Sequence, residues 1–218
     1  MADSTLPDTY VQKFLKNFAP AVINAEVDTI TANRYGVKSY PTTLILNRQG
    51  QEIDRLVGYF PPEEFVAGVT NALAGIGTLD DLLRKSEAEP VVDNIYEVGQ
   101  KYRWRGEYDQ AASFFNRVMA MDPTNASGKS AESAYNLGHM KYKLKDYLSA
   151  VELWKKMVAA YPSDEISIDA ELMTAYSYQK AGDFKNAQKE YKAFLKKHPD
   201  TEEKEWIEEQ FTAMKSKK

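Results

Sequence analysis

Few side chains in this sequence could perform catalysis. Its 218 residues include no cysteine and only two histidines, His139 and His198. The absence of thiols excludes disulfides, thiolate metal ligands and thiol nucleophiles. The two histidines are too far apart in sequence to form the helix-borne pair that binds zinc, and no Gly-rich phosphate loop or Ser-His-Asp set is present. The residues therefore predict no enzymatic activity, no cofactor and no metal ion.

Paired carboxylates occur at Glu63-Glu64, Asp80-Asp81 and Glu202-Glu203. Each pair stands at the start of a predicted helix, where the helix dipole favours negative charge. We interpret these pairs as helix-start signals, because that role accounts for them without any acid–base chemistry.

Composition restricts the class of partner. Hydrophobic residues make up 43% and charged residues 28% of the chain, which is typical of a folded protein with room for two domains. The formal net charge of -4 gives no electrostatic reason to bind nucleic acid. No apolar run is long enough to span a membrane, and the first residues lack the pattern of a signal peptide. As written, the chain is predicted to be cytoplasmic, and its oligomeric state stays open.

The first 76 residues alternate between helical and extended patterns. Residues 8–18 have the apolar spacing of an amphipathic helix, and residues 61–75 begin with prolines and acids, as helices often do. The order predicts an α/β segment, residues 1–76, followed by a linker helix, residues 77–90. The predicted elements are helix 8–18, strand 21–27, helix 29–37, strands 39–47 and 51–59 joined by a tight turn, and helix 61–75.

From residue 91 onward the sequence is helical and repeats itself. Three segments of equal length align: 98–123, 137–162 and 174–199, each ending in proline. Small residues recur at equivalent positions and let two helices approach closely, while large aromatics recur where they would fill the groove between the helices. Residues 91–218 are thus predicted to form three helical hairpins and a C-terminal capping helix. The recurring sets are Gly99, Gly138 and Ala175; Ala111, Ala150 and Ala187; and Phe115, Trp154 and Tyr191.

This pattern resembles the tetratricopeptide repeat, and the length of the repeats is similar to that of bacterial envelope scaffold proteins. The second copy departs from the pattern in having Lys141 where Tyr102 and Tyr178 stand. The resemblance implies a protein or peptide partner on the concave face formed by the first helix of each hairpin. The inward positions would be Tyr96, Gln100, Arg103, Trp104, Tyr135, His139, Tyr142, Lys143, Leu172, Tyr176, Gln179 and Lys180.

Aromatic rings beside Arg and Lys are typical of binding hot spots, and the cations would meet carboxylates of an acidic partner. On this hypothesis Trp104, Tyr135 and Tyr142 anchor the apolar part of the ligand, while Arg103 and Lys143 meet its acids. The alternative is that the rings pack against neighbouring helices and the cations are solvated. Sequence alone leaves both interpretations open.

The first 76 residues resemble the later part of a thioredoxin fold. The resemblance rests on Tyr35-Gly36-Val37, Tyr40-Pro41-Thr42, Gly50 and Gly58. It implies a cis proline at Pro41, in a loop formed by Tyr40, Pro41 and Thr42 that in the family faces redox cysteines. The family's first strand, which lies between the strands equivalent to residues 21–27 and 42–47, and its Cys-x-x-Cys motif are absent. The expected fold class is a partial thioredoxin-like α/β segment followed by an all-α repeat array, α+β and then α.

Two functions follow from these resemblances. The leading one is a protein-interaction or scaffold protein, redox-inactive as written, that binds its partner in the repeat groove. The alternative is a truncated thiol–disulfide oxidoreductase or isomerase, of a family that maintains redox homeostasis, with its Cys-x-x-Cys upstream of Met1. A missing upstream segment would also allow a periplasmic or exported protein.

The lack of cysteine generates a first prediction. The purified 218-residue chain should not accelerate the reduction of insulin by dithiothreitol, because dithiol exchange requires thiolates that it does not have. The measurement is insulin turbidity against a buffer blank. A rate above the blank would contradict the prediction for this polypeptide.

Overall fold

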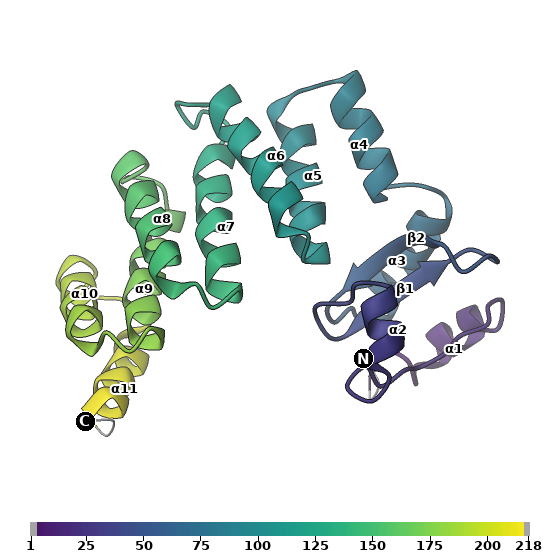
Figure 1. The fold of residues 1–218 in the computed structure, drawn as a ribbon, viewed down its shortest axis with the longest axis horizontal. Coiled ribbons are helices and arrows are strands. Elements are labelled where there is room, and N and C mark those ends of the chain that lie inside the picture. Colours follow the sequence, from purple (N-terminus) through teal and green to yellow (C-terminus); the bar gives the residue numbers. More distant parts are fainter. Residues whose placement is uncertain (1–3, 216–218) are drawn as a thin grey trace. The chain divides into compact units, whose positions relative to one another are not determined.

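The computed structural model describes residues 4–215, and the chain divides into two compact units. The N-terminal unit comprises residues 1–111 and the C-terminal unit residues 112–218, so that the division falls within helix α6 (Tyr108–Met121). Figure 1 shows a small sheet with helices early in the chain and helices alone thereafter, as predicted. The outermost residues of the predicted ranges 1–76 and 91–218, namely 1–3 and 216–218, lie outside the described residues.

The N-terminal unit contains a short antiparallel sheet and five complete helices. Asp8 begins α1 by accepting hydrogen bonds from the backbone N–H groups of Tyr10 and Val11, and Thr78 begins α4 in the same way. The elements are α1 (Thr9–Leu15), α2 (Thr29–Arg34), β1 (Thr42–Leu46), β2 (Glu52–Val57), α3 (Pro62–Leu73), α4 (Leu79–Ala88) and α5 (Val92–Arg105). Helix α4 lies within the segment predicted as a linker helix, residues 77–90.

The predicted strand at residues 21–27 is wrong. Strands β1 and β2 pair with each other, Thr42 opposite Val57, and residues 21–27 are neither paired nor covered. Val22 and Val27 are 82% and 80% exposed. A strand is stable only when its backbone groups find a ladder partner, and residues 21–27 pair with neither β1 nor β2. Its apolar composition therefore does not produce a strand.

The two faces of the sheet are held by different chemistry. On one face, Ile45 and Leu56 belong to a core with Phe65 of α3 and Val11 of α1. Because neighbouring strand residues point to opposite faces, Arg55 lies on the other. Its guanidinium donates to the carbonyl oxygens that end α2, 2.8 Å from Tyr35 O and 3.4 Å from Gly36 O. An apolar core and a buried guanidinium thus cover the sheet.

Ion pairs fasten strand β2 to helix α5. Lys101 Nζ lies 2.5 Å from Asp54 Oδ2, and Arg105 Nη1 lies 2.8 Å from Glu52 Oε1. The Asp54 side chain is only 4% exposed. Burial alone would raise the pKa of Glu52, but the hydrogen bond from Arg55 and the charge of Arg105 lower it. A lowered folded-state pKa means that Glu52 stabilises the fold above its unfolded pKa and loses this contribution as the pH falls.

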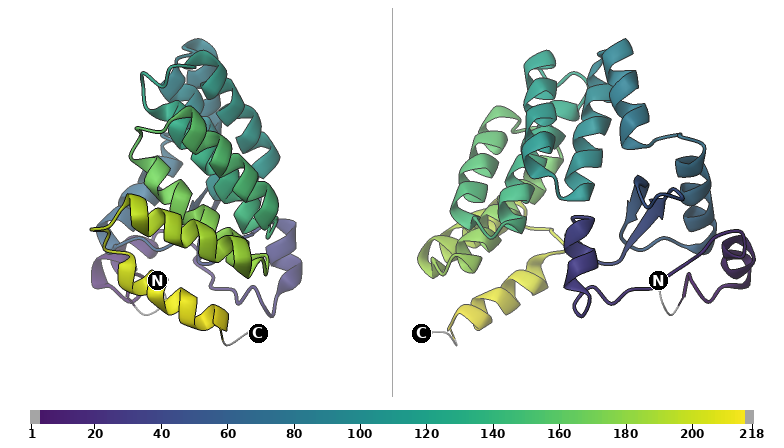
Figure 2. Two further views of the ribbon diagram at one scale, coloured as in Figure 1. Left: turned by 90° about the vertical axis from the view of Figure 1, so that its left-hand side faces the viewer. Right: turned by 45° about the vertical axis from the view of Figure 1, so that its right-hand side comes forward.

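The C-terminal unit is entirely helical. Successive helices α7 to α11 pack on one another in order, as the views in Figure 2 also show. The helices are α7 (Lys129–Lys143), α8 (Tyr147–Ala160), α9 (Ile166–Lys180), α10 (Phe184–Lys197) and α11 (Lys204–Lys215). The predicted capping helix is α11, whose Ile207 and Met214 are fully buried. None of the helices described between residues 4 and 215 is long and apolar enough to cross a membrane.

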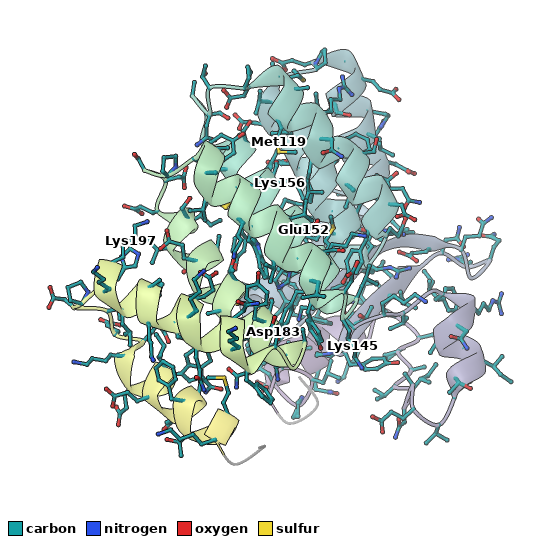
Figure 3. The ribbon with its side chains drawn as sticks, turned by 60° about the vertical axis from the view of Figure 1, so that its left-hand side comes forward. Met119, Lys145, Glu152, Lys156, Asp183 and Lys197 are labelled. Atoms are coloured by element: carbon teal, nitrogen blue, oxygen red, sulfur yellow. The ribbon has the colours of Figure 1, made fainter. Side chains whose placement is uncertain are left out.

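The two turns inside these hairpins differ in one residue. Gly182 ends α9 with a φ of 82°, whereas Lys145, labelled in Figure 3, takes the corresponding left-handed conformation with a φ of 63° after α7. Glycine adopts this conformation freely and lysine does not. The geometry of the hairpin therefore overrides the preference of the residue in the second repeat.

The ion pairs on β2 generate a prediction about stability. Lys101→Met should lower the free energy of unfolding by about 2–3 kcal/mol, because it removes the hydrogen-bonded cation of the buried Asp54 carboxylate and leaves only Arg105, 3.7 Å away. Lys85→Met is the matched control: it removes an ion pair with Asp81 whose lysine is 54% exposed, and should cost under about 1 kcal/mol. Urea unfolding followed by circular dichroism measures both. Equal effects of the two substitutions would show that the Asp54 pair does not hold α5.

Candidate protein-binding face

Five aromatic rings form a continuous row in the C-terminal unit, which we call the aromatic row: Tyr135, Trp154, Tyr142, Tyr176 and Trp206. The Trp154 ring, fully buried on α8, lies 5.9 Å from Tyr135 and 6.3 Å from Tyr142 of α7. Tyr142 then stacks on Tyr176 of α9 at 6.1 Å, and Tyr176 meets Trp206 of α11 edge-on at 5.5 Å. The row runs across the contacts of α7 with α8, of α7 with α9 and of α9 with α11. All its members except Trp154 are half-buried.

The row depends on close approach of α7 to α8. Trp154 Nε1 donates a hydrogen bond of 3.1 Å to Tyr135 O, which requires the indole to lie against the backbone of α7. Gly138 makes this possible: a Cβ there would lie far inside van der Waals contact of the Trp154 ring. The small residue that recurs in the repeats thus positions the first rings of the row.

Phenol hydroxyls and an ammonium group meet at one end of the row. Lys180 Nζ lies over the Tyr176 ring, 4.8 Å from its centroid, and a hydrogen bond with Tyr176 raises the pKa of Lys180. Burial, helped by the neighbouring Tyr176, raises the pKa of Tyr142 to about 12. Near neutral pH the ammonium is therefore charged and the Tyr142 phenol is protonated, so that both offer hydrogen-bond donors.

Lys143 and Lys180 differ from two lysines elsewhere in the unit, Lys155 and Lys197. Within residues 4–215, neither Lys143 nor Lys180 makes an ion pair, and both are exposed. By contrast Lys155 on α8 lies 2.7 Å from Glu190, and Lys197 on α10, labelled in Figure 3, pairs with Glu171. The Lys180 ammonium thus lies beside the aromatic row without an ion-pair partner among residues 4–215.

Of the three remaining predicted residues of this unit, Leu172 packs partly buried against the core of α9, α10 and α11, and the other two play different parts. His139 stacks on Tyr135 with a centroid distance of 6.4 Å and extends the row along α7. Gln179 is engaged internally, because its Oε1 accepts from the Tyr191 hydroxyl at 2.9 Å and its Nε2 donates to Gln210. His139 therefore belongs to the face, whereas Gln179 helps to pack it.

Four predicted residues lie on α5 in the N-terminal unit and form a group of their own. Gln100 bonds the Tyr96 hydroxyl and accepts from Arg103 Nε at 2.7 Å, and the Arg103 guanidinium lies 4.3 Å from the Trp104 ring centroid. Tyr96 is only 8% exposed, so its ring is part of the core and is not a surface anchor. Trp104 is 55% exposed and fits the predicted role better.

The predicted loop at residues 40–42 leads into strand β1, whose first residue is Thr42. The peptide bond between Tyr40 and Pro41 is cis, and the Tyr40 ring is 61% exposed. Thr42 Oγ1 donates to Ser39 O at 2.7 Å, and Gly58 N donates to Pro41 O at 2.8 Å. These bonds fix the entry into the sheet.

Sequence reasoning missed two contributors to the site. Trp206, in the first turn of the capping helix α11, completes the aromatic row. Tyr147, the first residue of α8, has its ring 5.4 Å from that of Tyr142. Both aromatic residues lie in the first turn of a helix. The periodicity of apolar residues along a helix does not indicate that such positions belong to a surface row. Across residues 4–215, no group of three histidine or carboxylate side chains could hold a metal ion.

Comparison with known families agrees with this description. Residues 8–72 match a family described as a thioredoxin-like domain. Residues 127–208 match YfiO, a family described as an outer membrane lipoprotein. The chain is thus similar to two families over separate segments, one on each side of residue 111, and neither match covers half of it. No curated protein matches the chain.

The contact between Gly138 and Trp154 generates a third prediction. Gly138→Ala should destabilise the chain by about 1–3 kcal/mol, because the added methyl group overpacks the α7–α8 contact. The sign of the change in stability is the test, because a glycine-to-alanine substitution in an unobstructed helix instead stabilises the protein by about 1 kcal/mol. Urea unfolding with tryptophan fluorescence measures the effect. A stabilised variant would show that α7 does not need this close approach.

Proposed function

We propose that this chain binds a protein or peptide partner on the aromatic row of its C-terminal unit. The observation that carries the proposal is a continuous row of half-buried rings beside two lysines that have no acidic partner among the described residues. Half-buried aromatics are rigid anchors that lose little entropy on binding, and unpaired cations beside them select the charge of the ligand.

The chemistry of the face defines the ligand that suits it. The rings of Tyr135 and Tyr142 favour an apolar or aromatic side chain of the partner. Lys143, Lys180 and the phenol hydroxyls are donors, so that they favour carboxylates placed beside that side chain. A short acidic segment with an aromatic or aliphatic anchor would satisfy both parts of the face.

The family matches support this proposal in different degrees. The helical array matched over residues 127–208 is the part of the chain that carries the aromatic row. The name of that family, outer membrane lipoprotein, supports an exported form of the chain as part of the same proposal. The scaffold role, in which the chain holds one protein near another, follows if the thioredoxin-like unit has a partner of its own.

Thiol–disulfide exchange is the second candidate, favoured by the match of residues 8–72 to thioredoxin-like domains. It requires thiols that residues 1–218 do not contain. In that case the aromatic row would recruit the substrate, and the redox-active groups would come from another polypeptide segment.

The proposed function generates a fourth prediction. A peptide selected from a displayed random library against the chain should be rich in acidic and aromatic residues. Its affinity should fall about 30-fold for Tyr142→Ala, which corresponds to about 2 kcal/mol for an aromatic anchor. Lys180→Met should cost less, and its effect should shrink with added salt, because an exposed charge is screened. Isothermal titration calorimetry measures each affinity.

Two controls make this test specific. Tyr142→Phe keeps the ring and its packing, so it should bind better than Tyr142→Ala if the ring is the anchor. Leu148→Ala changes a residue that is 55% exposed on α8 but is not part of the row, and it should bind like the parent chain. Unchanged affinity in Tyr142→Ala and Lys180→Met, with circular dichroism like that of the parent, would contradict the proposal. The rings would then serve only to pack the helices.

A further inference from the structure

Helix α10 carries a row of exposed lysines along its outer face, which we call the lysine stripe: Lys185, Lys189, Lys192 and Lys196. Because an α-helix turns by about 100° per residue, their spacing keeps all four within an arc of roughly 60° and spreads them over about 16 Å of the helix. Ala187 and Phe194, both buried, lie on the opposite side. In Figure 3, Asp183 and Lys197 mark the two ends of this helix.

Neighbouring acids do not neutralise the lysine stripe. Across residues 4–215, none of its four lysines makes an ion pair or a side-chain hydrogen bond. Glu190, the acidic residue within α10, lies roughly a third of a turn away from the stripe and pairs with Lys155 of α8. Asp183 has its pKa lowered chiefly by hydrogen bonds from Asn186, and the charge of Lys185 contributes less. The middle of the stripe therefore presents positive charge to the solvent.

The repeat fold does not require lysines at these positions. Segments 98–123 and 137–162 align with 174–199, so that each position of the stripe has an equivalent on α6 and on α8. A charge needed for packing the hairpins would recur there, as the small residues do. Of the equivalents only Lys155 is a lysine, and it is paired with Glu190. The equivalents are Asp109, Ser113, Asn116 and Ala120 on α6, and Leu148, Glu152, Lys155 and Ala159 on α8.

The composition of the stripe favours one kind of anion. Lysine is a strongly hydrated point charge, whereas the planar fork of arginine matches single carboxylates and phosphates. The stripe contains no arginine and no aromatic ring. Protein–protein interfaces are depleted in lysine, and sites for single-stranded nucleic acid add rings on which bases stack. A line of lysines alone suits a broad negative surface with mobile charges, such as a layer of anionic lipid head groups.

We propose that the lysine stripe docks the chain on an anionic membrane surface, with α10 lying along the bilayer. Each lysine near such a surface strengthens binding about fivefold, so that four together strengthen it on the order of several hundredfold. Charges farther from the surface than a Debye length of about 10 Å are screened, so that the formal net charge of -4 does not cancel this local attraction. The contact is electrostatic, and no side chain needs to enter the hydrocarbon.

Cosedimentation of the full chain with lipid vesicles tests the proposal. The chain should sediment with vesicles of phosphatidylcholine and phosphatidylglycerol at about 0.1 M salt and not at about 1 M, where the Debye length falls to about 3 Å. It should not sediment with phosphatidylcholine alone. Lys189→Gln combined with Lys192→Gln should lower the affinity about 30-fold, at about fivefold per lysine. Glutamine has nearly the helix propensity of lysine, so that α10 should stay folded, which circular dichroism checks.

Lys13→Gln combined with Lys16→Gln is the matched control. It changes the net charge by the same amount but alters two exposed lysines at the end of α1, in the N-terminal unit. Because it leaves the lysine stripe intact, it should bind the anionic vesicles like the parent chain.

Three results would overturn the proposal. The first is a parent chain that does not bind anionic vesicles at about 0.1 M salt, where attraction is only partly screened. The second is an equal loss of affinity in the two double variants, because net charge and not the stripe would then decide binding. The third is binding to a DNA duplex or to polyglutamate without binding to vesicles, which would assign the stripe to a soluble polyanion. The aromatic row is tested separately, since Lys189 and Lys192 are not part of it.

Discussion

An isolated two-stranded hairpin is only marginally stable in water, and this constraint governs the N-terminal unit. Strands β1 and β2 persist because α1, α2, α3 and α5 cover or fasten them. Helix α3 supplies the apolar core, the end of α2 receives the Arg55 guanidinium, and α5 is fastened by the pairs of Asp54 with Lys101 and of Glu52 with Arg105. The fastening is electrostatic, so that its strength depends on keeping both partners of each pair.

In the C-terminal unit, the corresponding constraint is steric. Helices α7 and α8 approach until the Trp154 indole touches the backbone beside Gly138, and this contact sets the positions of Tyr135 and Tyr142. The same rings then meet Tyr176 and, beyond it, Trp206. Packing does not bury these tyrosines completely. Tyr135, Tyr142 and Tyr176 hold neighbouring helices together and remain half-buried.

Sequence patterns predicted the elements that depend on local periodicity. The hairpins α7–α8 and α9–α10 with their proline ends, the capping helix and the β1–β2 hairpin are all present. The prediction of a strand at residues 21–27 was wrong, because a strand forms only beside another strand and local composition does not reveal whether one is there. The ion pairs of Asp54 and Glu52 with α5 could not be foreseen, since they join residues about 50 positions apart with no shared pattern. Of the predicted contact residues, Tyr96 turned out to be buried because its position on α5 faces the core.

Some lysines of the C-terminal unit are paired with a glutamate, and Lys180 beside the aromatic row is not. Where a lysine lies between helices, as Lys155 and Lys197 do, a glutamate from the neighbouring helix neutralises it. Along the aromatic row the Lys180 ammonium instead lies over the Tyr176 ring, 4.8 Å from its centroid, which orients it without cancelling its charge. An ammonium group that is oriented but not neutralised has lost part of its conformational freedom in advance, so that binding a carboxylate there costs less entropy than binding it to a freely moving lysine. This physical asymmetry is the reason to expect an acidic partner at this end of the row.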